Sequence, residues 1–169
     1  MRLAFYVVLM TLLGPLFGQE GKQNQFPETH YDRGMELYRE GRFNAAVAQF
    51  RNYLNVAGNS PQRSEAEYYY AISKLKAQHT DGVASLQQFL DQNPGSLKTN
   101  EANLALGDYY YLKPRYSNAL RYYKNVDEKS IDKELRSRLN YRKGFCLVNA
   151  KKYKDAVEVL KSDADAPGE

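Results

Sequence analysis

The sequence has few of the side chains on which most catalytic and metal sites depend. It contains one cysteine, Cys146, two histidines, His30 and His79, and no tryptophan. One thiol cannot form a disulfide within the chain, and two histidines so far apart match no paired-histidine metal motif. Glycine-rich phosphate loops and nucleophile elbows are also absent from the sequence. We therefore expect a protein that is not an enzyme and binds no cofactor or metal. Cys146 is expected to be a small buried apolar side chain, with a reactive thiol as the alternative.

The chain also has little excess charge and, beyond its beginning, no long apolar segment. Lys and Arg total 24 against 20 Asp and Glu, a net charge of +4, and no basic run is interleaved with aromatic residues. This pattern does not favour a nucleic-acid partner. After the first 18 residues no apolar segment is long enough to span a bilayer. We therefore expect no membrane span once those residues are removed.

The segment 1–18 is typical of a secretory signal peptide. Arg2 supplies a positive charge, Leu3 to Phe17 are nearly all apolar, and a small residue precedes the expected cleavage site. The apolar run is shorter than the roughly 20 residues of a transmembrane helix, which leaves an uncleaved anchor as the alternative. No cysteine follows it directly, as a bacterial lipoprotein would require. Residues 19–27 are expected to be a flexible lead-in, and residues 163–169 a polar tail.

What the sequence does contain is a repeat. A glycine and an alanine twelve positions apart occur three times, as Gly34 with Ala46, Gly107 with Ala119, and Gly144 with Ala156. Gly82 stands where the alanine of a further repeat is expected. Ala46, Gly82, Ala119 and Ala156 therefore follow one another at intervals of 36, 37 and 37 residues. A period in this range is typical of stacked helical hairpins, whose helices cross closely at small residues. A large apolar residue four positions after each alanine is expected to pack on the next hairpin. Such arrays are binding surfaces more often than catalysts.

The spacing of apolar residues predicts eight helices in four pairs and no strand. Their expected ranges are 28–40 and 44–56, 62–77 and 80–92, 99–112 and 116–125, and 132–150 and 153–162. Gly41 marks the turn of the first pair, because a helix often ends at a left-handed glycine. Pro114 marks the turn of the third pair, because proline disfavours helical geometry in the residue before it.

The second pair carries three local signals. Thr80 is the expected N-cap of its second helix. Ser64 and Glu67 have the spacing of a capping box for its first helix, although residues 60–61 could start that helix earlier. The interval that ends at Gly82 within this pair is eleven residues rather than twelve. We therefore expect its turn to be one residue shorter than the others.

These positions resemble the repeat of the tetratricopeptide family, which carries a small residue, an aromatic residue, an alanine and a large apolar residue at fixed places. The matching residues are Gly34, Phe43, Ala46 and Phe50, then weakly Ala71, His79, Gly82 and Leu86, then Gly107, Tyr116, Ala119 and Tyr123, then Gly144, Tyr153, Ala156 and Leu160. The resemblance covers about residues 28–162. It implies an all-α fold, an α-solenoid of about four helix-turn-helix repeats, preceded by the signal peptide. The long period and the leader resemble exported tetratricopeptide proteins of bacterial envelopes.

In this family the first helix of each repeat lines a concave groove that binds a partner. Carried over, the groove positions are Tyr31, Tyr38, Tyr68, Ile72, Leu104, Asp108, Tyr111, Tyr141 and Phe145, with Arg142 beside them. Tyrosine supplies a large contact area and a hydroxyl group, and the resemblance implies an aromatic ladder along the groove. The alternative is that these rings fill the space between repeats. Arg142 is either a solvated charge or an anchor for a ligand carboxylate.

The function we expect is that of a non-catalytic interaction scaffold or adaptor of the bacterial cell envelope. It would hold a segment of a protein or peptide partner in the groove, and it would be exported to the periplasm or associated with the outer membrane. Two alternatives remain open. The chain could be the structural front end of a longer or self-assembling repeat protein, which includes a homo-oligomer, or it could activate an envelope hydrolase.

Overall fold

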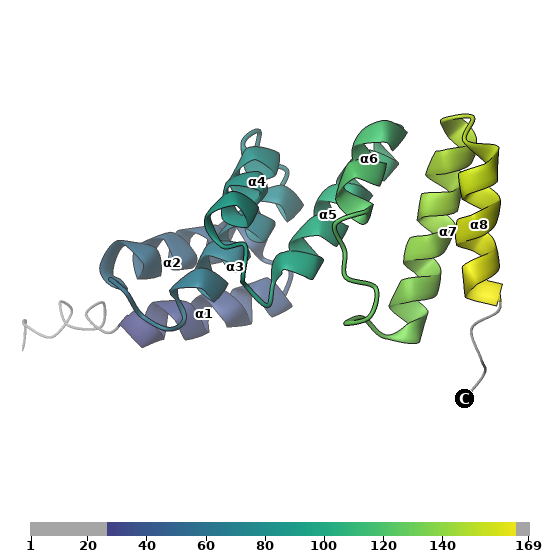
Figure 1. Ribbon diagram of the computed structural model, residues 1–169. Helices are drawn as coiled ribbons and strands as arrows, with labels where there is room; N and C mark the ends of the chain where they lie inside the picture. The colour runs from purple at the N-terminus through teal and green to yellow at the C-terminus, as the bar shows by residue number, and fades with distance from the viewer. Residues whose placement is uncertain (1–26, 165–169) are drawn as a thin grey trace, which may run out of the picture.

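The computed structural model describes residues 27–164, and all regular structure in this range is α-helical (Figure 1). The helices are α1 (Pro27–Arg39), α2 (Phe43–Val56), α3 (Arg63–Lys76), α4 (Gly82–Gln92), α5 (Thr99–Leu112), α6 (Tyr116–Tyr123), α7 (Lys133–Asn149) and α8 (Tyr153–Ala164). The expected signal peptide, the lead-in up to residue 26 and the tail from residue 165 lie outside the described residues. The helix α1 includes the last residue of the expected lead-in, and α8 extends two residues into the expected tail.

The eight described helices form four hairpins that stack in chain order, as the repeat predicts (Figure 1). Each helix makes its most extensive contacts with its neighbours in the chain. In the view of Figure 1, α1 and α2 lie nearly horizontal, whereas α7 and α8 stand nearly upright. The hairpin axes therefore rotate along the stack, which is the geometry of a solenoid. The predicted all-α solenoid of about four hairpins is confirmed.

The two helices of a hairpin cross closely where the repeat places its glycines. A Cβ atom added to Gly34 would lie 2.8 Å from the Phe50 ring, and one added to Gly107 would lie 2.3 Å from the Tyr123 ring. The large residue after each alanine thus packs first on the glycine of its own hairpin, which corrects the expectation that it packs on the next. Phe50 does both, because its ring also stacks on that of Tyr69 in α3, with centroids 5.7 Å apart.

The turns within all four hairpins end their first helix in the same way. Each contains a hydrogen bond from a backbone N–H to the carbonyl five residues earlier, at 2.9–3.0 Å: Arg42 to Leu37, His79 to Lys74, Arg115 to Tyr110, and Lys152 to Leu147. This bond is typical of a helix end that has a left-handed residue just before the donor. Gly41 takes that conformation with φ of +74°, as predicted, but Gln78 and Lys151 take it with φ of +59°.

Replacing Lys151 by glycine should therefore stabilise the protein. A left-handed conformation costs a side-chain-bearing residue about 1–2 kcal/mol, and the extra backbone entropy of glycine offsets part of that gain. We expect a net increase of roughly 0.5–1 kcal/mol in the free energy of unfolding, measured by urea titration with far-UV circular dichroism. Lys152→Gly is the matched control, because φ of Lys152 is not positive, and it should destabilise. Equal losses in both variants would contradict the prediction.

The link between α3 and α4 is longer than the other three hairpin turns, so the expectation of a shorter turn was wrong. Five residues separate Lys76 from Gly82, whereas three residues form the corresponding link in each other hairpin. The added length is an extra turn, in which the Gly82 N–H donates to the His79 carbonyl at 3.0 Å. The spacing of eleven residues that ends at Gly82 could not reveal this turn. The second helix of each other hairpin begins three residues before its repeat alanine, whereas α4 begins at Gly82 itself.

The predicted N-caps of the second hairpin are not formed as expected. The N-cap position of α4 is taken by Asp81 rather than Thr80, and the Asp81 carboxylate makes an ion pair with Lys74 of α3 instead of capping the helix. The Ser60 hydroxyl oxygen accepts a hydrogen bond from the Gln62 N–H at 3.3 Å in the turn before α3. The earlier start at residues 60–61 is also wrong, because α3 begins at Arg63 and its N-cap residue, Gln62, makes no side-chain capping hydrogen bond.

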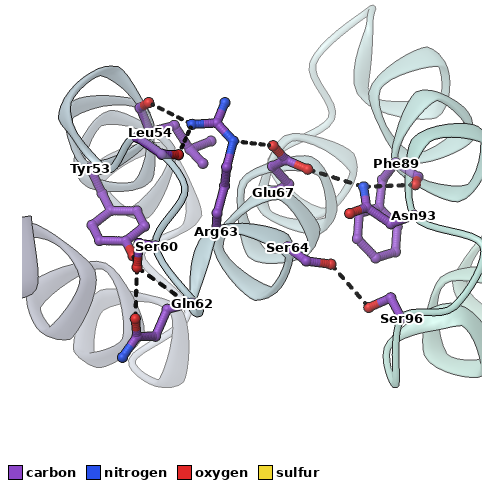
Figure 2. Close-up of polar contacts among 11 residues, drawn as sticks. Tyr53, Leu54, Ser60, Gln62, Arg63, Ser64, Glu67, Phe89, Asn93 and Ser96 are labelled. Carbon is purple, nitrogen blue, oxygen red and sulfur yellow. Dashed lines mark hydrogen bonds and ion pairs between the residues drawn. The ribbon is translucent and has the colours of Figure 1, made fainter.

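The two capping-box side chains instead connect the start of α3 to the end of α4 and to the link that follows it (Figure 2). The Ser64 hydroxyl donates to Ser96 at 3.3 Å. Glu67 forms an ion pair with Arg63 at 3.0 Å and accepts a hydrogen bond from the amide of Asn93, also at 3.0 Å. Asn93 is the C-cap of α4, so these contacts tie the start of α3 to the end of α4. Ser64 and Glu67, which the local pattern assigned to capping, bind residues from other parts of the fold instead.

Candidate functional site

The first helices of the four hairpins together line a groove of about 290 Å³. Its lining is Tyr38 from α1; Tyr68, Ile72 and Lys76 from α3; Glu101, Leu104, Ala105 and Asp108 from α5; Tyr123 from α6; and Leu135, Arg138, Leu139 and Arg142 from α7. We call this lining the groove. Its volume is near the lower end of the roughly 300–1,000 Å³ of small-molecule pockets, so it has room for one or two side chains of a partner.

The bottom of the groove is apolar and belongs to the protein core. Tyr68 and Ile72 line it but are only 6% and 2% exposed, and they are members of the main core cluster. Leu104 and Ala105 pack partly buried against the same cluster. Burial raises the pKa of Tyr68, so its phenol stays neutral in this environment. A partner that entered the groove would therefore meet an apolar surface supported by a packed core.

One wall of the groove is a network of three polar side chains centred on Asp108. The Tyr123 hydroxyl donates to Asp108 Oδ1 at 2.8 Å, and the Arg142 guanidinium donates to the same oxygen. The guanidinium also lies 5.6 Å from the centroid of the Tyr111 ring. Helices α5, α6 and α7 each contribute to this network, so it joins the third hairpin to the fourth.

The electrostatics of this network keep Arg142 charged and bound to Asp108. Burial raises the pKa of Tyr123, and the Asp108 carboxylate raises it further, so the hydroxyl remains a donor. Burial alone would lower the pKa of Arg142, but its hydrogen bond to Asp108 and the charge of that carboxylate raise it overall. Arg142 is thus neither the solvated charge nor the free carboxylate anchor considered from the sequence, because Asp108 already pairs with it.

Two other cations stand at the rim of the groove. The Lys76 ammonium lies 5.7 Å from the Tyr38 ring centroid and 5.3 Å from that of Phe43, within the range of cation–π attraction. Arg138 is exposed and makes no ion pair between residues 27 and 164. Glu101 supplies a negative charge, but Lys98 pairs with it at 3.3 Å. The rim therefore offers two positive groups beside an apolar floor.

Six of the ten residues that the resemblance placed in the groove line it in the structure. They are Tyr38, Tyr68, Ile72, Leu104, Asp108 and Arg142. The remaining four lie elsewhere. Tyr31 packs on Tyr53, with centroids 5.4 Å apart, Tyr111 and Phe145 form a ring pair at 5.5 Å, and Tyr141 is exposed on α7.

The implied aromatic ladder does not form within the described residues. No ring contact joins Tyr31, Tyr68 and Tyr141 to one another in this range. Tyr69 lies between hairpins instead, with its ring centroid 5.0 Å from that of Tyr38 and 5.1 Å from that of Tyr68. The alternative, that tyrosines fill the space between repeats, holds for Tyr38 and Tyr69, whose rings meet between the first and second hairpins.

Sequence reasoning missed Tyr123, which reaches the groove from a second helix. Gly107 makes this possible, because its missing side chain leaves room for the Tyr123 ring to cross α5. The other missed lining residues lie on first helices, and all of them except Leu135 are three or four positions from predicted ones. Glu101 precedes Leu104 by three positions, and Arg138 precedes Arg142 by four. Helical spacing could therefore have found these two, whereas Tyr123 required the three-dimensional crossing.

A larger cleft of about 660 Å³ lies between α4, α5 and α6. Some of its polar groups bind one another: the Tyr122 hydroxyl accepts hydrogen bonds from the Gln87 amide and, at 2.9 Å, from Arg121. The buried Asn103 Oδ1, which also lines the cleft, has no hydrogen-bond partner among the described residues. Only two neighbouring hairpins and the segment between them build this cleft, whereas all four hairpins contribute to the groove. The groove is therefore the better candidate for holding an extended segment.

Cys146 is fully buried, and burial raises the pKa of its thiol to about 11, which agrees with the small buried side chain predicted from the sequence. Across residues 27–164 there is no group of three or more His, Cys, Asp or Glu side chains that could hold a metal ion. Over the same range, no helix has both the length and the apolar character needed to cross a membrane.

A stack of helical hairpins with a groove along its first helices defines a helical-repeat binding protein. The family model described as Tetratricopeptide repeat matches residues 76–132, which run from the end of α3 to just before α7. For these residues the match supports the tetratricopeptide family that the repeat spacing indicated. Such repeats generally mediate protein–protein interactions and are typically non-catalytic. No curated protein matches the chain.

Proposed function

We propose that this protein is a non-catalytic scaffold or adaptor of the bacterial cell envelope that holds a segment of a partner protein in the groove. The observation that carries the proposal is the convergence of α1, α3, α5 and α7 on one apolar-floored groove. A segment lying along it would contact all four hairpins at once. The contact would resemble the recognition of a peptide in an apolar groove, where a few anchoring side chains supply most of the affinity.

The chemistry of the groove indicates how a partner segment would be held. An apolar side chain would occupy the floor beside Ile72, Leu104 and Ala105, because that surface is backed by the core. Polar or acidic groups of the segment would face Arg138 and Lys76 at the rim. The pair of Asp108 and Arg142 would stay closed and shape the wall, since breaking it would leave a partly buried charge without a partner.

The proposed location rests on the sequence of residues 1–18, which is typical of a leader for export. The mature chain would then reside in the periplasm or beside the outer membrane. N-terminal sequencing of the protein from a cell-envelope fraction tests this. A new N-terminus near residue 19 is expected, and an intact Met1 in the cytoplasmic fraction would contradict the proposal.

The binding proposal is tested by photo-crosslinking from the groove in an extract of the producing cells. A benzoylphenylalanine residue in place of Arg138 should form protein adducts, because this exposed residue lines the rim. The same residue in place of Gln88, which is exposed on α4 and lies outside the groove, is the control and should form few. Adding Ala105→Phe, which narrows the groove, should reduce the adducts from position 138 at least tenfold. Equal labelling from both positions, or labelling insensitive to Ala105→Phe, would rule out the groove as the binding site.

A further inference from the structure

The last hairpin carries an apolar face that nothing in the described part of the chain covers. It consists of two side chains from α7 and three from α8, each between 43% and 61% exposed: Tyr141, Val148, Tyr153, Val157 and Leu160. We call these five residues the end face. Exposed apolar patches of this kind on a folded protein often mark interaction sites.

The same positions in earlier hairpins are buried under a helix. Leu160 is 43% exposed, whereas Phe50 and Tyr123, which occupy its place in the first and third hairpins, are fully buried. Val157 is 51% exposed, whereas Leu120 in the corresponding place is 7% exposed. The difference arises because α3 packs on α2 and α7 packs on α6, while no described helix follows α8 (Figure 1). The end face is therefore shaped to receive one more helix.

The charge around the end face indicates which kind of helix would fit. Residues 133–161 contain nine Lys and Arg against three Asp and Glu, and two of these cations, Arg142 and Lys143, already form ion pairs with Asp108 and Glu128. Lys154 and Lys161 flank Val157 at the three- and four-residue spacings that bring side chains together on a helix. Neither lysine makes an ion pair within residues 28–161. The apolar stripe of α8 is thus bordered by unpaired positive charge.

This charge also argues against the end face of a second copy as the occupant. A two-fold dimer through the end face would bring the same basic residues of both copies together, and like charges across an interface are unfavourable. A helix with acidic side chains beside its apolar stripe would pair with Lys154 and Lys161 instead.

We propose that the end face binds an amphipathic α-helix of another protein, whose apolar stripe is flanked by acidic residues. This helix would occupy the place on α7 and α8 that α3 and α7 occupy on the hairpins before them. The site is separate from the groove, and the proposal stands or falls independently of the proposed function.

The test uses the full chain and two labelled 21-residue helical peptides with the same leucine stripe, one flanked by glutamate and the other by lysine. Fluorescence anisotropy at low ionic strength should show the glutamate peptide binding at least tenfold more tightly. Raising the salt concentration should weaken this binding, because the charges are exposed and screened. Lys154→Glu combined with Lys161→Glu should reverse the preference between the peptides.

Two further variants show where the peptide binds. Tyr153→Asp combined with Val157→Asp should reduce the affinity for the glutamate peptide at least tenfold, and the exposure of both side chains should leave the fold intact by circular dichroism. Leu112→Asp, a substitution of an exposed residue outside the end face, is the matched control and should bind normally. Ala105→Phe should also bind normally, since it alters only the groove.

Three results would overturn the proposal. Equal affinity for the two peptides would show that the charge does not select the partner. A concentration-dependent dimer in light scattering that Tyr153→Asp with Val157→Asp abolishes, together with no peptide binding, would identify a second copy as the occupant. Binding to vesicles of anionic phospholipid, but to neither peptide, would identify a membrane surface.

Discussion

Replacing Gly107 by alanine should lower the free energy of unfolding by roughly 1–3 kcal/mol, the usual cost of overpacking a core. The added Cβ would lie 2.3 Å from Cε1 and 2.4 Å from Cδ1 of the Tyr123 ring, which is closer than real Cβ contacts come. The ring has little freedom to move, because Tyr123 is fully buried and its hydroxyl is bound to Asp108. The third hairpin would have to open, and that would disturb the groove wall.

The sign of the stability change in Gly107→Ala distinguishes two effects. Steric overlap with Tyr123 lowers the stability, whereas the higher helix propensity of alanine raises it. Gly107 lies inside α5, where alanine is normally the more stable residue by about 0.5–1 kcal/mol. Gly95→Ala provides the control, because a Cβ at that position meets nothing within 4 Å. Chemical denaturation of both variants gives the comparison. If Gly107→Ala were as stable as the original protein or more stable, the helices would not cross as tightly as the structure shows.

Stability should fall steeply as the pH rises above about 10, the ordinary pKa of tyrosine. Burial raises the pKa of Tyr31, Tyr68 and Tyr123 in the folded protein, and neighbouring carboxylates contribute at all three sites. A group with a raised pKa in the folded state contributes stability that is fully present below its unfolded pKa. The contribution is lost as the pH rises through the range between the two values, because the unfolded chain then releases protons more readily.

The measurement is guanidinium unfolding at pH 8, 9.5, 10.5 and 11.5, followed by far-UV circular dichroism. The loss should be about 1.4 kcal/mol per pH unit for each such tyrosine. Tyr68→Phe should flatten the decline above pH 10, since it removes one of these groups. Tyr153→Phe, at a side chain that is 59% exposed, should leave the decline unchanged. A decline that is equally steep in both variants would show that the buried phenols are not responsible.

The fold followed from the sequence because its signals are local and repeated. Glycine and alanine at fixed spacing marked the helix crossings, and three of the four repeats agreed in register. The deviations came where a non-local partner competed with a local preference. Asp81 binds Lys74 instead of capping α4, and Ser64 binds Ser96 in the link between α4 and α5. Neither partner is visible in a window of neighbouring residues.

The candidate site was predictable in part for the same reason. Residues at the regular inward positions of α3 and α5, such as Ile72 and Leu104, line the groove as the resemblance implied. Tyr31 and Tyr141 occupy equivalent places in the repeat, but they lie at the two ends of the array. Tyr31 packs on rings of its own hairpin, and Tyr141 has no described following helix beside it. Position in a repeat does not tell an inner repeat from an outer one.

The sequence by itself determined that this protein is a stack of helical hairpins, since helix spacing and small crossing residues are properties of short segments. Only the tertiary structure decided that Arg142 is paired with Asp108, that Tyr123 reaches the groove past Gly107, and that no described residue covers the end face. These features depend on how far each hairpin is rotated and shifted against the next. That geometry results from side-chain packing between residues far apart in the chain, which no local pattern encodes.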